Sequence, residues 1–143
     1  MIGHHVWLTT KGAGTMTAID VVLTGSPADL YAWTIIERCV VIRVGFIIET
    51  AVSSSVSAVV NFDRIPNAGG SREAAFAALT IPTGATTGDY YYEEPSTTKT
   101  LYPGDIVICE LLTVSDSAGT GHPFLIVEPI PERPANETQS NAG

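Results

Sequence analysis

The feature that most constrains the fold is a run of eleven residues, CVVIRVGFIIE, at positions 39–49. Its apolar residues occupy alternate positions, namely Val40, Ile42, Val44, Phe46 and Ile48. The intervening positions are mixed and hold Arg43, Gly45, Ile47 and Glu49. Because successive side chains of a β-strand point to opposite faces, this period of two predicts a strand with one face in the core and one mixed face.

Similar short segments recur along the chain, divided by clusters of Gly, Pro, Ser, Thr and Asn. The predicted strands are 17–23, 39–49, 57–62, 76–81, 105–114 and 123–128. Short strands at such spacing are typical of antiparallel sandwiches and barrels. A chain of 143 residues fits one domain. We therefore predict an all-β, single-domain antiparallel jelly roll or β-sandwich.

Two segments are also compatible with helices. SPADLYAWTIIER has Ser26 at a possible N-cap and Pro27 at the first helical position, but Tyr31, Trp33 and Ile35 alternate. We predict a turn followed by a strand. SREAAFAALTI tolerates either state but runs into TIPTG, which is typical of a strand that enters a turn. We expect little helix.

The segment 105–114 is apolar at both parities. Ile106, Ile108, Leu112 and Val114 point one way, and Val107, Cys109 and Leu111 point the other. Such a strand is either central in a two-layer stack or covered on its outer face by another subunit.

The two ends of the chain are predicted to extend from the domain. The domain spans residues 1–128 and includes an N-terminal arm at 1–16, and a proline-rich tail follows at 129–143. Pro129, Pro131 and Pro134 favour an extended tail. The tail either frays or orders on a neighbouring chain.

Charge limits the partners. The chain has 7 Lys and Arg against 15 Asp and Glu, a net charge of −8, so a nucleic-acid backbone would be repelled. No apolar run reaches the roughly 20 residues of a membrane helix. The first residues also lack the basic segment and apolar run of a signal peptide. We expect a protein that is made and kept in a cytoplasm and binds neither nucleic acid nor membrane.

Candidate catalytic chemistry is thin. His4 and His5 are adjacent and diverge in an extended chain, and His122 is the only other histidine, so we expect no metal site. Ser115, Asp116 and Ser117 share a loop with His122, but nothing indicates a triad. Cys39 and Cys109 lie in apolar runs without a nearby cation, and we expect two inert thiols rather than a disulfide or a reactive thiol. We expect no cofactor and no enzymatic activity.

The stretch GDYYYEEP combines three tyrosines with carboxylates. Two of the carboxylates Asp89, Glu93 and Glu94 would suffice for a glycosidase pair, and the tyrosines suggest stacking on a sugar ring. We favour an amphipathic strand or loop whose phenols lie at a surface or subunit contact.

The order of several segments resembles the jelly-roll cement or decoration proteins of tailed-phage heads. The segments are YAW, RVGFIIETA, VVNFDRIPNAGGSREAAFAALTIP and TLYPGDIVICELLTVSDSAGTGHPFLIVE. They cover roughly residues 31–128. In that family a strand ending in an SFDxRP pattern precedes a Gly- and Ser-rich loop with an Arg, and a PGD turn precedes a doubly apolar strand. The present chain differs by Ile65 between Arg64 and Pro66.

The resemblance implies a homotrimer on the outside of the virion capsid, assembled in the host cytoplasm, that links neighbouring major capsid proteins and stabilises the shell. The alternative is another phage structural or binding module, such as a head-fibre base, tail or carbohydrate-binding domain. Arg and Tyr are enriched at interface anchors. The candidate contact residues are Arg64, Arg72, Tyr90, Tyr91, Tyr92 and Phe124.

Overall fold

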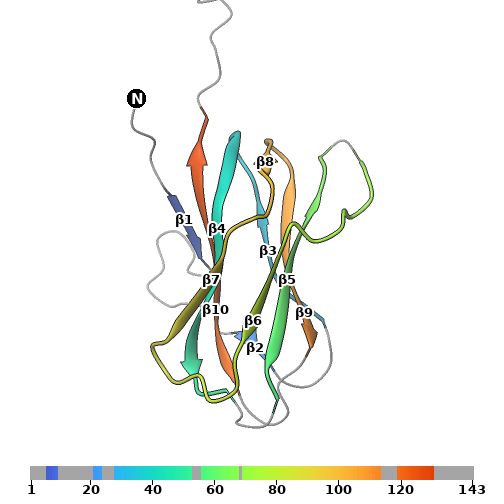
Figure 1. The fold of residues 1–143 in the computed structure, drawn as a ribbon. Coiled ribbons are helices and arrows are strands. Elements are labelled where there is room, and N and C mark those ends of the chain that lie inside the picture. Colours follow the sequence, from blue (N-terminus) through green and yellow to red (C-terminus); the bar gives the residue numbers. More distant parts are fainter. Residues whose placement is uncertain are drawn as a thin grey trace, which may run out of the picture.

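Two antiparallel β-sheets pack face to face as a sandwich in this computed structural model (Figure 1). The structure describes residues 6–9, 21–23, 28–52, 56–67, 69–113 and 119–130. The strands are β1 (Val6–Thr9), β2 (Val21–Val22), β3 (Ala28–Thr34), β4 (Cys39–Thr50), β5 (Ala58–Ile65), β6 (Ala77–Ile81), β7 (Tyr90–Glu93), β8 (Thr100–Leu101), β9 (Ile106–Thr113) and β10 (Thr120–Pro129).

The two sheets are built from strands that are distant in the sequence. The first sheet has the order β1-β10-β4-β7, with β2 paired to β10 and β8 paired to β4. The second sheet has the order β3-β9-β5-β6. Each strand pair among the described residues is antiparallel. The predicted all-β sandwich is confirmed, the described residues contain no helix, and the strand order is compatible with a jelly roll.

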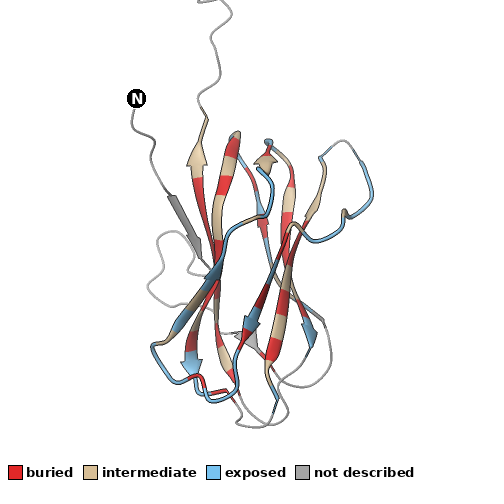
Figure 2. Cartoon of the chain, in the orientation of Figure 1, coloured by how far each residue is buried: buried red, intermediate tan, exposed pale blue. Residues whose placement is uncertain are grey.

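The core lies between the sheets and follows the strand period. Strand β6 shows it most simply, because Ala77, Leu79 and Ile81 are buried while Ala78 and Thr80 are exposed. Figure 2 shows the same alternation along β4 and β5, and a mostly exposed β7. The largest side chains buried in this core are Phe46, Phe62, Leu23, Ile48, Ile81, Leu101, Leu111 and Leu125. Phe124 is also fully buried but lies outside this core.

The predicted parity of 39–49 is wrong in its first half. Val44, Phe46 and Ile48 are buried as expected, but Val40 and Ile42 are only half-buried, and Cys39 and Val41 take the core positions. The reason is a register shift in the pairing with β10. Ile126 lies opposite Arg43, whereas the next residue, Val127, lies opposite Val41. Ile42 is the extra residue, and a bulge of this kind exchanges the two faces of a strand.

Both helix-compatible segments contain strands. The first contains β3, in which Trp33 is 7% exposed and stacks on Phe62 with ring centroids 6.2 Å apart, so the prediction of a strand is confirmed. The second contains β6. Ser26 and Pro27, the possible helix start, lie outside the described residues.

Several strands begin or end at residues other than those predicted from the sequence. The segment predicted at 57–62 continues to Ile65, and that predicted at 123–128 begins at Thr120. Of the segment predicted at 17–23, the described part is β2 and Leu23. Strand β1 falls within the predicted N-terminal arm and pairs with β10. The tail from residue 131 onward lies outside the described residues.

The doubly apolar strand is central in its sheet. Strand β9 lies between β3 and β5, which is one of the two explanations that the sequence left open. Val107, Cys109 and Leu111 face the core, while Ile108 is buried on the outer face and Leu112 is 49% exposed there. Val114 lies outside the described residues.

The centre of the first sheet depends on one close approach. Phe124 on β10 lies opposite Gly45 on β4, and its ring covers the place where a side chain at Gly45 would be. A Cβ at position 45 would lie 2.1 Å from Cζ of Phe124. Phe124 is only 1% exposed, so its ring has little room to move away. Gly45 therefore provides the space into which the Phe124 ring packs.

We expect Gly45→Ala to lower the free energy of unfolding by about 1–3 kcal/mol, because the added methyl group overpacks the ring. Urea denaturation measures the loss. Phe124→Leu provides the matched test, since it removes the end of the ring that the methyl group meets. In the double variant the alanine should cost less than it does alone, with a coupling of at least about 0.5 kcal/mol. Strict additivity would contradict the proposed contact.

Candidate functional site

Exposed aromatic side chains gather on the outer face of the first sheet. Tyr90 and Tyr92 on the edge strand β7 are 61% and 42% exposed, and their ring centroids are 6.2 Å apart. Tyr90 lies opposite Ile47 of β4, and Tyr92 lies opposite Gly45. Directly paired residues share a face of a sheet. We call the exposed Tyr90 and Tyr92, the half-buried Ile47 and Arg43, and the buried Phe124 together the aromatic surface.

Two hollows flank Tyr90. One, of about 200 Å³, is lined by Ile47, Gly88, Tyr90 and Phe124. The other, of about 360 Å³, is lined by Gly88, Asp89, Tyr90 and Tyr91. Tyr90 therefore stands between an apolar hollow and a more polar one, with much of its ring open to solvent.

Tyr92, by contrast, already has a cation over its ring. The guanidinium carbon of Arg43 lies 4.3 Å from the ring centroid of Tyr92. Nε of Arg43 also lies 3.4 Å from Oε2 of Glu94. Together these contacts form a cation–π pair with a carboxylate beside it. The sequence contained a signal for Arg43 and Ile47, because both stand at the mixed positions of 39–49.

Tyr91 faces the other way from its neighbours. It is half-buried, packs against the core, and its hydroxyl donates to Oδ2 of Asp89 at 3.4 Å. Burial raises the pKa of Tyr91, and the charge of Asp89 raises it further. The backbone N–H of Thr86 donates to Asp89 at 2.9 Å and lowers the pKa of that carboxyl. Tyr91 therefore stabilises the turn before β7 and does not join Tyr90 and Tyr92.

Arg64 lies apart from the aromatic surface and is held by the chain's own carboxylates. Nε of Arg64 donates to Oδ2 of Asp105 at 2.8 Å, and Nη1 lies 3.5 Å from Glu73, which also binds Lys99 at 2.8 Å. Asp105 is 1% exposed and accepts further hydrogen bonds from the backbone N–H groups of Tyr102 and Asn67 at 2.8 and 2.9 Å.

Arg72 crosses the outer face of the second sheet. It binds Asp63 on β5 at 2.7 Å, Asp29 on β3 at 3.0 Å and Glu110 on β9 at 3.2 Å. Burial by itself would lower the pKa of Arg72, but the hydrogen bonds and charges of Asp63 and Asp29 raise it overall. Because β9 lies between the other two strands, the guanidinium spans the strand that carries Ile108. The chain itself therefore occupies part of this face.

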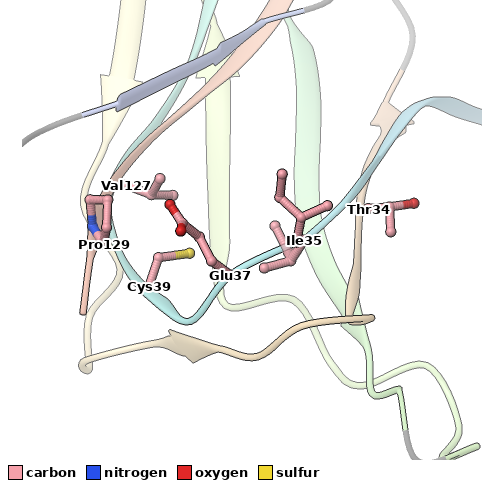
Figure 3. Close-up of a pocket in the computed structure, with 7 residues that line it drawn as sticks. Thr34, Ile35, Glu37, Cys39, Val127 and Pro129 are labelled. Carbon is pink, nitrogen blue, oxygen red and sulfur yellow. The ribbon is translucent and has the colours of Figure 1, made fainter. Parts of the chain in front are cut away.

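A third feature is an apolar pocket of about 190 Å³ at one end of the sandwich. Figure 3 shows Thr34 and Ile35 on one side, Val127 and Pro129 on the other, and Glu37 and Cys39 between them. Burial raises the pKa of the Cys39 thiol to about 11, and the charge of Glu37 adds to this effect. Burial also raises the pKa of Cys109. Both cysteines are buried and free, as the sequence predicted.

The remaining sequence candidates do not form a described catalytic cluster. His122 lies on β10 with Nε2 3.8 Å from Oε1 of Glu49. Among the described residues no three His, Cys, Asp or Glu side chains are grouped to hold a metal ion. His4, His5 and the loop residues 115–117 lie outside the described part of the chain. No described helix is long and apolar enough to cross a membrane.

Of the sequence candidates, the structure brings together Tyr90, Tyr92 and Phe124. The sequence of this chain matches no known protein family and no curated protein, and its structure matches no solved structure.

We expect acid to weaken the fold through Asp105. Burial would raise the pKa of this carboxyl, but hydrogen bonds from Tyr102, Asn67 and Arg64 outweigh burial and lower it. A lowered pKa gives stability that is present above the unfolded value of about 3.9 and is lost as the pH falls through the folded value. Asp105→Asn should cost about 3 kcal/mol at pH 7, because Arg64 loses its buried partner.

Urea denaturation between pH 7 and pH 2.5 measures both effects. Between pH 7 and pH 2.5, Asp105→Asn should lose less of its free energy of unfolding than the parent protein does. Glu94→Gln is the control, since Glu94 is well exposed, and it should stay within about 0.5 kcal/mol of the parent at pH 7. Equal pH profiles for the parent and Asp105→Asn would contradict the assignment.

Thiol labelling tests the cysteines. At pH 8 the raised pKa of Cys39 keeps its thiolate fraction roughly a hundredfold below that of an ordinary thiol. We expect iodoacetamide to label the native protein far more slowly than the protein unfolded in guanidinium, as read by mass spectrometry. Fast native labelling of either cysteine would show that its environment is open.

Proposed function

We propose that this chain is a structural protein of a tailed-phage virion, a decoration protein that binds the outside of the head and links neighbouring major capsid proteins. The structural observation that carries the proposal is the aromatic surface, because exposed tyrosines with an arginine are typical of protein interfaces. The order of segments that resembles the phage decoration proteins gives the setting, and the β-sandwich scaffold agrees with it.

Such a protein acts through binding energy repeated over a shell. An interface of standard size buries about 1,600 Å², and many copies together oppose the expansion of a filled head. The proposed arrangement is a homotrimer on the capsid exterior. The net charge of −8 favours contact with basic patches of the capsid protein rather than with the packaged nucleic acid.

A second candidate is another phage binding module, such as a fibre base, a tail domain or a carbohydrate-binding domain. The specific observation in its favour is the hollow on each side of Tyr90, since an exposed ring beside a hollow can also stack on a sugar.

Copy number separates the candidates. In purified particles of the phage that encodes the chain, quantitative mass spectrometry should find it near the stoichiometry of the major capsid protein. Particles assembled without it should lose resistance to heat and osmotic shock. A few copies per particle would favour a tail or fibre role, and heads of unchanged resistance would overturn the decoration role.

A further inference from the structure

We propose that Tyr90 is the stacking position of a site that binds an arginine side chain of a partner protein. The site comprises Tyr90, Ile47, Glu49, Gly88 and Phe124. Binding is a property of the isolated chain, whereas the identification of the partner as a capsid protein rests on the proposed function.

The chain contains its own example of such a contact next to the site. Arg43 stacks on Tyr92 at 4.3 Å and pairs with Glu94 at 3.4 Å. An aromatic face and a carboxylate therefore hold a guanidinium on this side of the sheet. The described cations that lie over aromatic rings do so at Tyr92, Tyr102 and Phe76, so none of the described lysines and arginines stacks on Tyr90.

The strand register places a carboxylate beside Tyr90. Tyr92 lies opposite Gly45, and its diagonal neighbour on β4 is the cation Arg43. Tyr90 lies opposite Ile47, and the position there that corresponds to Arg43 is Gly45. Glu49 lies on the other diagonal, two residues further along β4. Diagonal neighbours on one face are about 7–8 Å apart and within reach of long side chains. The position at Tyr90 therefore has a ring and, on the same face, a carboxylate, and no described lysine or arginine stacks on that ring.

Glu49 is available for this role. Its side chain is 49% exposed, and Nε2 of His122 lies 3.8 Å from Oε1 of Glu49, which is too far for a hydrogen bond. Near Tyr90 the ionisable residues of this outer face are Arg43, Glu49, Glu94 and His122. Arg43 and Glu94 contact each other, which leaves Glu49 without a lysine or arginine partner among the described residues. Charge complementarity therefore favours a cation over an anion or a neutral ligand.

The apolar hollow suits the stem of the same side chain. Ile47, Gly88 and Phe124 line about 200 Å³ on one side of the Tyr90 ring. Arginine buries its methylene groups along apolar surface while its charged head stays near water. Its planar guanidinium also stacks on aromatic rings, which favours arginine over lysine. The apolar hollow, the Tyr90 ring and the Glu49 carboxylate thus suit the stem and the charged head of one arginine side chain.

Nuclear magnetic resonance of the isolated protein, labelled at the tyrosine rings, tests the site. The probe is N-acetyl-arginine amide, and its matched control is N-acetyl-citrulline amide, which has nearly the same shape without the charge. We expect weak, saturable shifts of the Tyr90 resonances with the arginine probe and binding at least about threefold weaker with citrulline. Equal binding of the two probes would overturn the proposal.

Variants locate the interaction. Tyr90→Leu should weaken arginine binding at least about threefold, Tyr90→Phe should retain it, and Glu49→Gln should weaken it about twofold. For Tyr90→Leu, shifts of Ile47 and Phe124 report binding. Tyr102→Leu is the control at a second exposed tyrosine and should leave binding unchanged. Unchanged binding in Tyr90→Leu would overturn the proposal, as would stronger binding of methyl glucoside than of the arginine probe.

The outcomes also separate this inference from the proposed function. Arginine binding at Tyr90 in a chain that is absent from virions would sustain the site and refute the decoration role. If the chain is abundant on capsids but its Tyr90 resonances do not shift with the arginine probe, the site is refuted and the decoration role stands.

Discussion

The pairing of β4 with β10 is the interaction on which the first sheet depends. Both strands are long, they are distant in the sequence, and each of the described strands β1, β2, β7 and β8 pairs with one of them. The inner faces of the pair contribute Val44, Phe46 and Leu125 to the core. The outer faces carry Phe124 over Gly45, and the aromatic surface is built around that contact. The pairing of β4 with β10 therefore contributes both to the core and to the candidate site.

The two outer faces of the sandwich differ in how the chain itself occupies them. On the second sheet, Arg72 binds carboxylates from three strands and spans β9, and the apolar side chain of Ile108 on that strand is buried. On the first sheet, Tyr90 and Tyr92 remain exposed. Because aromatic side chains are exposed on one outer face and the other carries internal ion pairs, we propose that partners bind at the first sheet.

The sequence was sufficient for the fold class because alternation and turn residues are local signals. It misplaced Val40 and Ile42 because the bulge depends on the partner strand β10, which the period of β4 does not encode. Tyr90, Tyr92 and Phe124 were identified as candidates by residue type. Their grouping could not be predicted, since it requires the register of three strands. Likewise, Arg64 and Asp105 are 41 residues apart, and no local pattern relates them.

Because of the contacts of Arg72, the second sheet should tolerate substitution of one of the contacting carboxylates better than substitution of the arginine. The guanidinium of Arg72 forms ion pairs with Asp29, Asp63 and Glu110, so the loss of any one carboxylate leaves it with two partners. Loss of the arginine would instead leave like charges facing one another, and Asp63 is almost fully buried among them. Variation in related chains should therefore be freer at each acid than at the arginine, and a chain without the arginine should have lost acids as well.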